Sequence, residues 1–123
     1  MYVSKEKLRI AIPTKGKGGL KDVVSDVFGR ANTFTLVNIE NNKVKDVKVV
    51  KNPAASKTHG RGPVVVQTLL DHNVNVVIGS EFGPGISAML DKHRIRRMKV
   101  EPKTPVMDVV REFAFSFLKL CID

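Results

Sequence analysis

The sequence has a single cysteine and no tryptophan, and aromatic residues make up only 6% of its 123 positions. One cysteine, Cys121, cannot form an internal disulfide and cannot hold an iron–sulfur cluster by itself. No apolar run approaches the roughly 20 residues of a membrane-spanning helix. The first residues also lack the apolar core of a signal peptide. The sequence therefore predicts a cytoplasmic protein without a membrane segment.

The remaining composition is that of an ordinary globular domain. Hydrophobic residues make up 42% of the chain and charged residues 27%, and such values favour a folded chain with a real core. We expect one domain over residues 1–123. The net charge is +9, with basic residues spread over 5–21, 43–61 and 92–103. This charge could attract nucleic acid, phosphate or an anionic metal cluster, or it could serve only solubility.

Apolar periodicity predicts alternating strands and helices. We expect strands at Leu8–Pro13, Thr33–Glu40, Lys43–Val50, Asn73–Gly79 and Ile95–Val100. We expect helices at Asp22–Gly29, from Pro63, at Pro84–Arg94 and from Thr104, with Cys121 buried on the last one. Asn41-Asn42 is typical of a hairpin turn. The order predicts an α/β fold with a mixed five-stranded sheet and helices on both faces, with the hairpin at one edge and Ile95–Val100 at the other.

Two corners rich in glycine and proline, His59-Gly60-Arg61-Gly62-Pro63 and Gly83-Pro84-Gly85, precede predicted helices. Helix starts carry unpaired N–H groups and partial positive charge, so they attract anions. Open sheets bind ligands outside the carboxyl ends of their parallel strands, where both corners would lie. The corners predict an anion pocket. The alternative is that their glycines and prolines only form the turns of two short loops.

A third loop, Thr14-Lys15-Gly16-Lys17-Gly18-Gly19, is basic and flexible. It lacks the closing Gly-Lys-Ser/Thr of a Walker A loop and the glycine spacing of a dinucleotide-binding loop. It is therefore only a weak signal for phosphate.

Several segments together resemble one known family: Leu8–Pro13, Val24–Ala31, Asn52–Ala54, His59–Pro63 and Gly83–Gly85. Over nearly its whole length the chain is similar to the dinitrogenase iron–molybdenum cofactor biosynthesis family, the NifX/NafY-like domain also found at the end of NifB. The resemblance implies a ribonuclease H-like fold. It also implies a non-enzymatic protein that binds an iron–sulfur or iron–molybdenum cluster precursor.

The sequence departs from that family's pattern at two places. The family commonly has a histidine before Phe-Gly-Arg, where this chain has Val27, which cannot ligate a metal. The family's small, glycine-rich stretch before Gly-Pro-Gly is here Ser80-Glu81-Phe82. We expect this carboxylate and ring to change the charge and the room of the pocket.

The candidate ligand-binding residues come from both corners and from the family segment around Phe-Gly-Arg. They are Arg30, His59, Gly60, Arg61, Gly62, Ser80, Glu81, Gly83 and Gly85. His59 is the candidate metal ligand, with Arg61 and Lys57 supplying positive charge, unless His59 only hydrogen-bonds its own loop. Because clusters normally take several thiolate or imidazole ligands, we expect a cluster to be held weakly here.

Two other functions remain open. A basic protein of the same fold could bind nucleic acid weakly, in a salt-dependent way and without reading bases. We do not expect nuclease activity in this alternative, because the first strand offers Arg9 and Ala11 where clustered carboxylates would be needed. Catalysis by Ser80, Glu81 and His59 is the third possibility, although no spacing singles these residues out.

Overall fold

The alternating apolar segments form five strands in the computed structural model, which describes residues 7–41 and 43–113. The strands are β1 (Lys7–Thr14), β2 (Thr33–Glu40), β3 (Lys43–Lys51), β4 (Val76–Gly79) and β5 (Arg96–Lys99). The helical elements are the short 3₁₀ turns η1 (Gly19–Lys21) and η2 (Phe28–Arg30), and the helices α1 (Arg61–Asp71) and α2 (Pro84–Lys92). A last helix includes residues 106–113.

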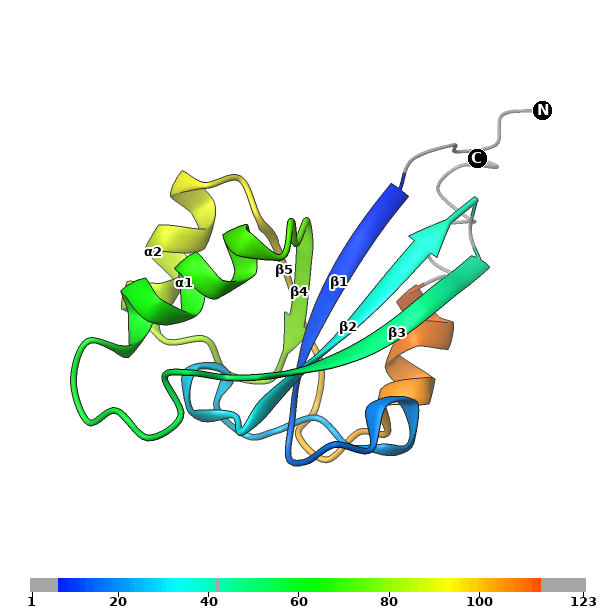
Figure 1. Ribbon diagram of the computed structural model, residues 1–123, viewed down its shortest axis with the longest axis horizontal. Coiled ribbons are helices and arrows are strands. Elements are labelled where there is room, and N and C mark those ends of the chain that lie inside the picture. Colours follow the sequence, from blue (N-terminus) through cyan, green and yellow to red (C-terminus); the bar gives the residue numbers. More distant parts are fainter. Residues whose placement is uncertain (1–6, 42, 114–123) are drawn as a thin grey trace.

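The strands make one mixed sheet in the order β3-β2-β1-β4-β5 (Figure 1). β2 runs antiparallel to both β1 and β3, whereas β1 pairs parallel with β4 and β4 pairs parallel with β5. Four strands therefore end at the same edge of the sheet, which we call the carboxyl edge. The predicted mixed five-stranded α/β sheet, with the hairpin at one side and the last strand at the other, is confirmed.

The hairpin follows the predicted turn, with Glu40 paired to Lys43 across it. Asn41 takes a positive φ of 54°, a conformation that asparagine tolerates better than most residues. A bulge interrupts the pairing between Asn38 and Ile39. Asn42 lies outside the described residues.

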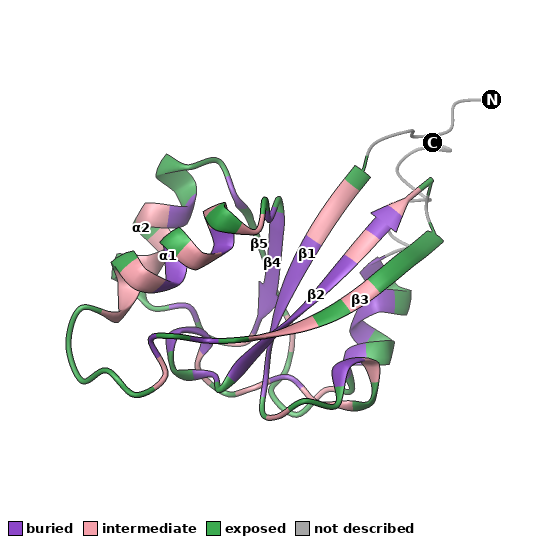
Figure 2. Ribbon diagram, viewed as in Figure 1, coloured by how far each residue is buried: buried purple, intermediate pink, exposed green. Residues whose placement is uncertain are grey.

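Helices cover both faces of the sheet, and each face has its own core. α1 and α2 bury one cluster, which includes Phe28, Phe34 and Leu69. The last helix buries the other, which includes Ile10, Ile78 and Val106. Figure 2 shows that β1, β2 and β4 are mostly buried while β3 and β5 lie exposed at the sides. Near-continuous apolar strands are expected where a sheet is covered on both faces.

The predicted helix over Asp22–Gly29 is wrong. Its apolar residues belong to different faces, since Val24 lies in the core under the last helix and Phe28 in the core under α1 and α2. The segment bridges instead to distant strands and loops, with Thr14 opposite Val24 and Glu81 opposite Val27. Only the 3₁₀ turns on either side are helical. The chain here crosses the carboxyl edge from one face to the other.

Other differences concern the ends of elements. α1 begins at Arg61, two residues before the predicted start, and β4 begins at Val76 instead of Asn73. α2 ends at Lys92. The predicted burial of Cys121 falls outside the described residues. No described helix has the length and apolar character needed to cross a membrane.

Candidate functional site

The first predicted corner forms the start of α1. Gly60 is the residue before the helix and has a φ of 69°, a left-handed conformation that favours glycine. No side chain caps this end, and Pro63 has no N–H to donate. The N–H groups of Arg61 and Gly62 therefore start the helix without a side-chain acceptor.

The second predicted corner forms the start of α2. Gly83 precedes the helix with a φ of 79°, and Pro84 occupies its first turn. This end also has no side-chain cap, and Gly83 and Gly85 are exposed. A proline at the first helical position suits the geometry and removes one unpaired donor.

The two helix starts meet the η2 turn around one side chain, Ile86. A Cβ on Gly62 would lie 3.6 Å from Ile86 Cγ1 and 3.5 Å from the Met89 sulfur. A Cβ on Gly29 would lie 2.9 Å from Ile86 Cδ1. The structure thus brings η2, which ends at Arg30, against the first turns of α1 and α2. We call the nine predicted binding residues on these three segments the corner site.

Coupling between Gly29 and Ile86 tests this close approach. We expect Ile86→Val to cost about 0.5–1 kcal/mol less in a Gly29→Ala background than alone, because the shorter side chain makes room for the added methyl. Urea unfolding of the four proteins in the cycle measures the coupling. The same cycle with Gly16→Ala is the control, since the contact found for a Cβ there is with the Asp22 carboxylate, at 3.6 Å, and not with Ile86. Equal coupling in both cycles would contradict the contact.

Positive charge dominates the corner site. Arg30 and His59 are exposed, Arg61 is half-buried, and the site's one carboxylate, Glu81, is exposed. The Arg61 Nε atom is buried without a hydrogen-bond partner. Buried donors in folded proteins are nearly always paired, so an orphaned one points to an absent acceptor such as a ligand or water.

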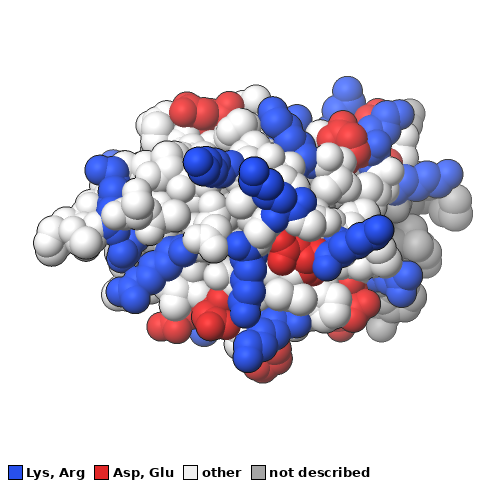
Figure 3. Space-filling model, turned by 60° about the horizontal axis from the view of Figure 1, so that its bottom comes forward, with Lys and Arg blue, Asp and Glu red and all other residues white. Residues whose placement is uncertain are grey.

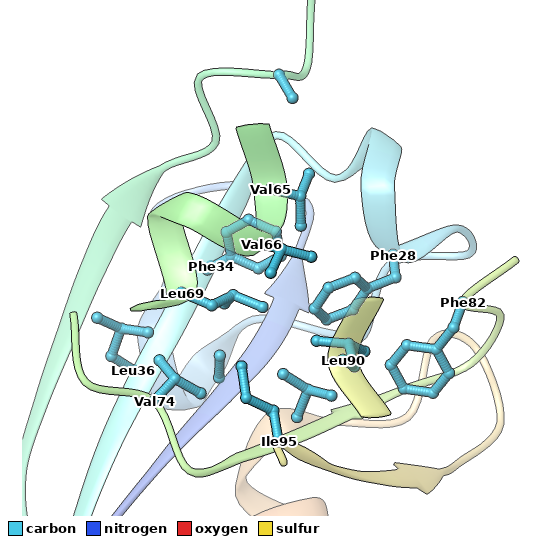
Figure 4. Packing of buried hydrophobic residues seen from close by; sticks show 13 residues of the cluster. Phe28, Phe34, Leu36, Val65, Val66, Leu69, Val74, Phe82, Leu90 and Ile95 are labelled. Carbon is cyan, nitrogen blue, oxygen red and sulfur yellow. The ribbon is translucent and has the colours of Figure 1, made fainter. Parts of the chain in front are cut away.

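The structure shows where the two departures from the family pattern lie, Val27 and the stretch Ser80-Glu81-Phe82. Phe82 is buried, with its ring centroid 5.0 Å from that of Phe28, so the ring fills the core instead of the pocket (Figure 4). The sequence led us to expect that this ring would change the room of the pocket, and the structure places it in the core beside Phe28. The Glu81 carbonyl accepts from Phe28 N at 2.8 Å, and Glu81 pairs in a bridge with Val27. This pairing joins η2 to the loop before α2.

Protein ligands for a metal are few. Residues 7–41 and 43–113 contain no cluster of three or more His, Cys, Asp or Glu side chains able to hold a metal ion. His59 is exposed on its loop, and no described residue completes a ligand set around it. The arrangement can hold an anion through N–H groups and cationic side chains instead.

The Asp22 carboxylate binds the backbone N–H groups of the Thr14–Gly19 loop. It accepts from Gly16 N at 2.8 Å, Gly18 N at 3.3 Å and Val23 N at 2.7 Å. Successive backbone N–H groups of this kind form an anion-binding concavity in phosphate loops. Here the protein's own carboxylate occupies it. The loop therefore cannot cradle a phosphate through its backbone as a Walker A loop does.

Sequence reasoning missed the role of Asn52, which is 3% exposed. Its Nδ2 donates to Ala31 O at 2.8 Å and Gly29 O at 3.2 Å, and its Oδ1 accepts from Ala54 N at 3.0 Å. Asn52 therefore ties the η2 turn to the loop that leads to His59. An asparagine directly after a strand and before proline was the available signal.

A family model matches most of the chain, and solved structures share its fold. The model of the family described as "Dinitrogenase iron-molybdenum cofactor" matches residues 6–115. The orange protein from Desulfovibrio gigas, in its apo form, is similar in structure with a TM-score of 0.79 and 25% identity, covering 92% of each chain. A Thermotoga protein provisionally described as NifB is 34% identical with a TM-score of 0.69, covering 89% of this chain and 88% of that one.

One curated relative also matches. The uncharacterized protein MJ0580 of Methanocaldococcus jannaschii is 30% identical over 77 residues. The match covers 63% of this chain and 61% of MJ0580, so the chain spans about three fifths of that relative's length.

Proposed function

Because the chain belongs to the dinitrogenase iron-molybdenum cofactor family, we propose that it is a small binding protein, without enzymatic activity, for an anionic metal–sulfur cluster or its precursor. In this proposal the cluster is cargo held at the corner site, and residues 1–123 act as one domain. We also propose that the fold is of the ribonuclease H-like type. The strand order supports that assignment, as does the single antiparallel strand, β2, between β3 and β1.

The observation that carries the proposal is the buried, unpartnered Nε of Arg61 at the start of α1. Arg61 lies in the first turn of α1, and this turn packs against α2. An anion placed there accepts hydrogen bonds from the Arg61 guanidinium and from N–H groups that no side chain caps. Charge-assisted hydrogen bonds of this kind are about twice as strong as neutral ones.

The donor set suits an anionic cluster docked by charge better than one bound through protein ligands. His59 offers one imidazole, and the described residues supply no group of three ligands. We therefore expect weak, salt-sensitive binding instead of a permanently held cluster. Weak binding fits a protein that passes its cargo on.

Nucleic acid is the less favoured partner. The four aromatic residues that the structure describes, Phe28, Phe34, Phe82 and Phe113, are all buried. They offer no exposed ring on which bases could stack. The family match also favours the first function over this one.

Binding of tetrathiomolybdate, a metal–sulfur dianion, tests the proposal. We expect Arg61→Gln to weaken binding about tenfold, because the variant loses the charge and the donor fork. Anaerobic equilibrium dialysis at low and high salt measures it. Arg111→Gln is the matched control, since Arg111 is exposed on the last helix, on the opposite face of the sheet.

Two results would contradict the proposal. One is equal binding by the Arg61→Gln and Arg111→Gln variants. The other is stoichiometric iron that survives desalting after incubation with a cluster donor and is unaffected by His59→Ala.

A Val27→His variant should retain more iron than the unmodified protein, because it restores an imidazole beside η2.

A further inference from the structure

A second basic hollow lies at the carboxyl edge, outside the corner site. Its volume is about 540 Å³, and its lining comes from three segments: the loop after β1, the start of β2 and the chain after β3. The residues are Lys15, Gly16, Lys17, Asn32, Thr33, Lys51, Asn52, Pro53, Ala55 and Ser56. None of the nine corner-site residues lines it. We call it the lysine hollow.

Strand pairing explains why its lysines meet. Thr33 pairs with Thr14 on one side and with Lys51 on the other, and Lys15 directly follows Thr14. Adjacent strands lie about 4.8 Å apart, so Lys15 and Lys51 leave the sheet on either side of β2 at a backbone separation of about 10 Å. Figure 3 brings this edge forward and shows more basic than acidic side chains across the face.

The charge in the lysine hollow is not neutralised by the protein. Lys15, Lys17 and Lys51 are exposed, and within residues 7–41 and 43–113 the one ion pair joins Arg97 to Asp91 instead. The lining contains no carboxylate. The nearby Asp22 carboxylate is already engaged by three backbone N–H groups.

The walls of the lysine hollow are held in place before any ligand binds. The Thr33 hydroxyl donates to Gly16 O at 2.5 Å. The Asn32 amide donates to Lys15 O at 2.9 Å. Asn52 is buried, and its side chain donates to Ala31 O and accepts from Ala54 N. Binding therefore orders little more than the lysine side chains, which reduces the entropic cost.

We propose that the lysine hollow binds a second anionic ligand, a chain of two or more phosphate groups. A hollow of this size suits a small molecule better than a macromolecular surface. The three lysines leave the backbone at separate points, about 10 Å apart for Lys15 and Lys51, so a chain of phosphates offers each of them an anionic group of its own. The lining contains no aromatic ring to recognise a base, so we expect binding to depend on the phosphates.

Titration calorimetry with pyrophosphate and tripolyphosphate tests this proposal on the full chain. We expect tripolyphosphate to bind more tightly than pyrophosphate, and orthophosphate to bind least. The combined variant Lys15→Gln, Lys17→Gln and Lys51→Gln should weaken tripolyphosphate binding at least about tenfold, because exposed charge contacts each contribute up to about a factor of five. In NMR spectra, the backbone amide signals of Gly16, Asn32 and Ser56 should shift as tripolyphosphate is added.

The matched control removes the same charge from the opposite edge of the sheet. Lys7, Lys43 and Lys92 are all exposed there. We expect the combined variant Lys7→Gln, Lys43→Gln and Lys92→Gln to bind tripolyphosphate within about threefold of the unmodified protein. An equal loss in both triple variants would overturn the proposal, because binding would then follow net charge alone. The absence of tripolyphosphate binding at low salt would overturn it as well.

Arg61→Gln separates this site from the proposed function. We expect it to leave tripolyphosphate binding unchanged while it weakens tetrathiomolybdate binding. If Arg61→Gln weakens both ligands equally, the two regions form one site and the inference of a second site is wrong. If tetrathiomolybdate does not bind but tripolyphosphate does, the cluster function fails and the lysine hollow stands.

Discussion

Phe28→Ala is expected to lower the free energy of unfolding by about 3–5 kcal/mol, the range for removing a large ring from a core. Phe28 is 0% exposed, and its ring centroid lies 5.1 Å from Phe34 and 5.0 Å from Phe82. Figure 4 shows the ring among side chains of α1 and α2. The variant leaves a cavity where η2, the sheet and both helices meet.

Chemical unfolding followed by circular dichroism measures this loss. We expect the Phe28→Ala protein also to bind tetrathiomolybdate less tightly, because the Phe28 ring packs η2 against the core under α1 and α2. Val109→Ala is the control: Val109 is 2% exposed in the other core, under the last helix. It should destabilise the fold less and leave anion binding of the remaining folded protein unchanged. A Phe28→Ala loss below about 1 kcal/mol would contradict the packing described here.

Asn52→Ala is expected to cost about 2–4 kcal/mol, although it removes few atoms. The substitution leaves the buried carbonyls of Gly29 and Ala31 and the buried N–H of Ala54 without their partner. Unpaired buried polar groups each cost about 1–3 kcal/mol. We therefore expect a larger loss than the change in side-chain volume predicts.

Asn32→Ala is the matched control for Asn52→Ala, because it removes the same side chain from an exposed position. The Asn32 side chain makes one hydrogen bond, to Lys15 O, and we expect its removal to cost no more than about 1 kcal/mol. Thermal unfolding by differential scanning calorimetry compares the two proteins. Equal losses would show that burial of the Asn52 amide does not matter, contrary to the hydrogen bonds seen here.

Local patterns were sufficient to predict most of the sheet. The alternation in β2 and β3 and the turn at Asn41 depend on residues close in the sequence, so the hairpin could be predicted without tertiary information. The helix predicted over Asp22–Gly29 was wrong for the opposite reason. Val23, Val24, Val27 and Phe28 have helical spacing, but Val24 and Phe28 pack on opposite faces of the sheet. Only long-range contacts reveal that division.

The candidate site, too, could be predicted only in part from the sequence. Glycine and proline place the corners before helices, and the direction of the strands places both at one edge, so their position could be predicted. The contacts of Gly29 and Gly62 with Ile86 depend on distances between elements. The same holds for the isolation of Arg61 Nε and the burial of Phe82. No spacing in the sequence encodes these features.

The Asp22 carboxylate competes with any external anion for the backbone N–H groups of the Thr14–Gly19 loop. Because it is attached to the same chain, its effective concentration at the Gly16 and Gly18 N–H groups is of millimolar order or higher. A dilute, singly charged anion gains too little there to displace it. We therefore expect the lysine side chains around the loop to select the ligands at this edge, because their attraction grows with the charge of the ligand. The Asp22 carboxylate would then favour highly charged ligands over chloride and other simple anions.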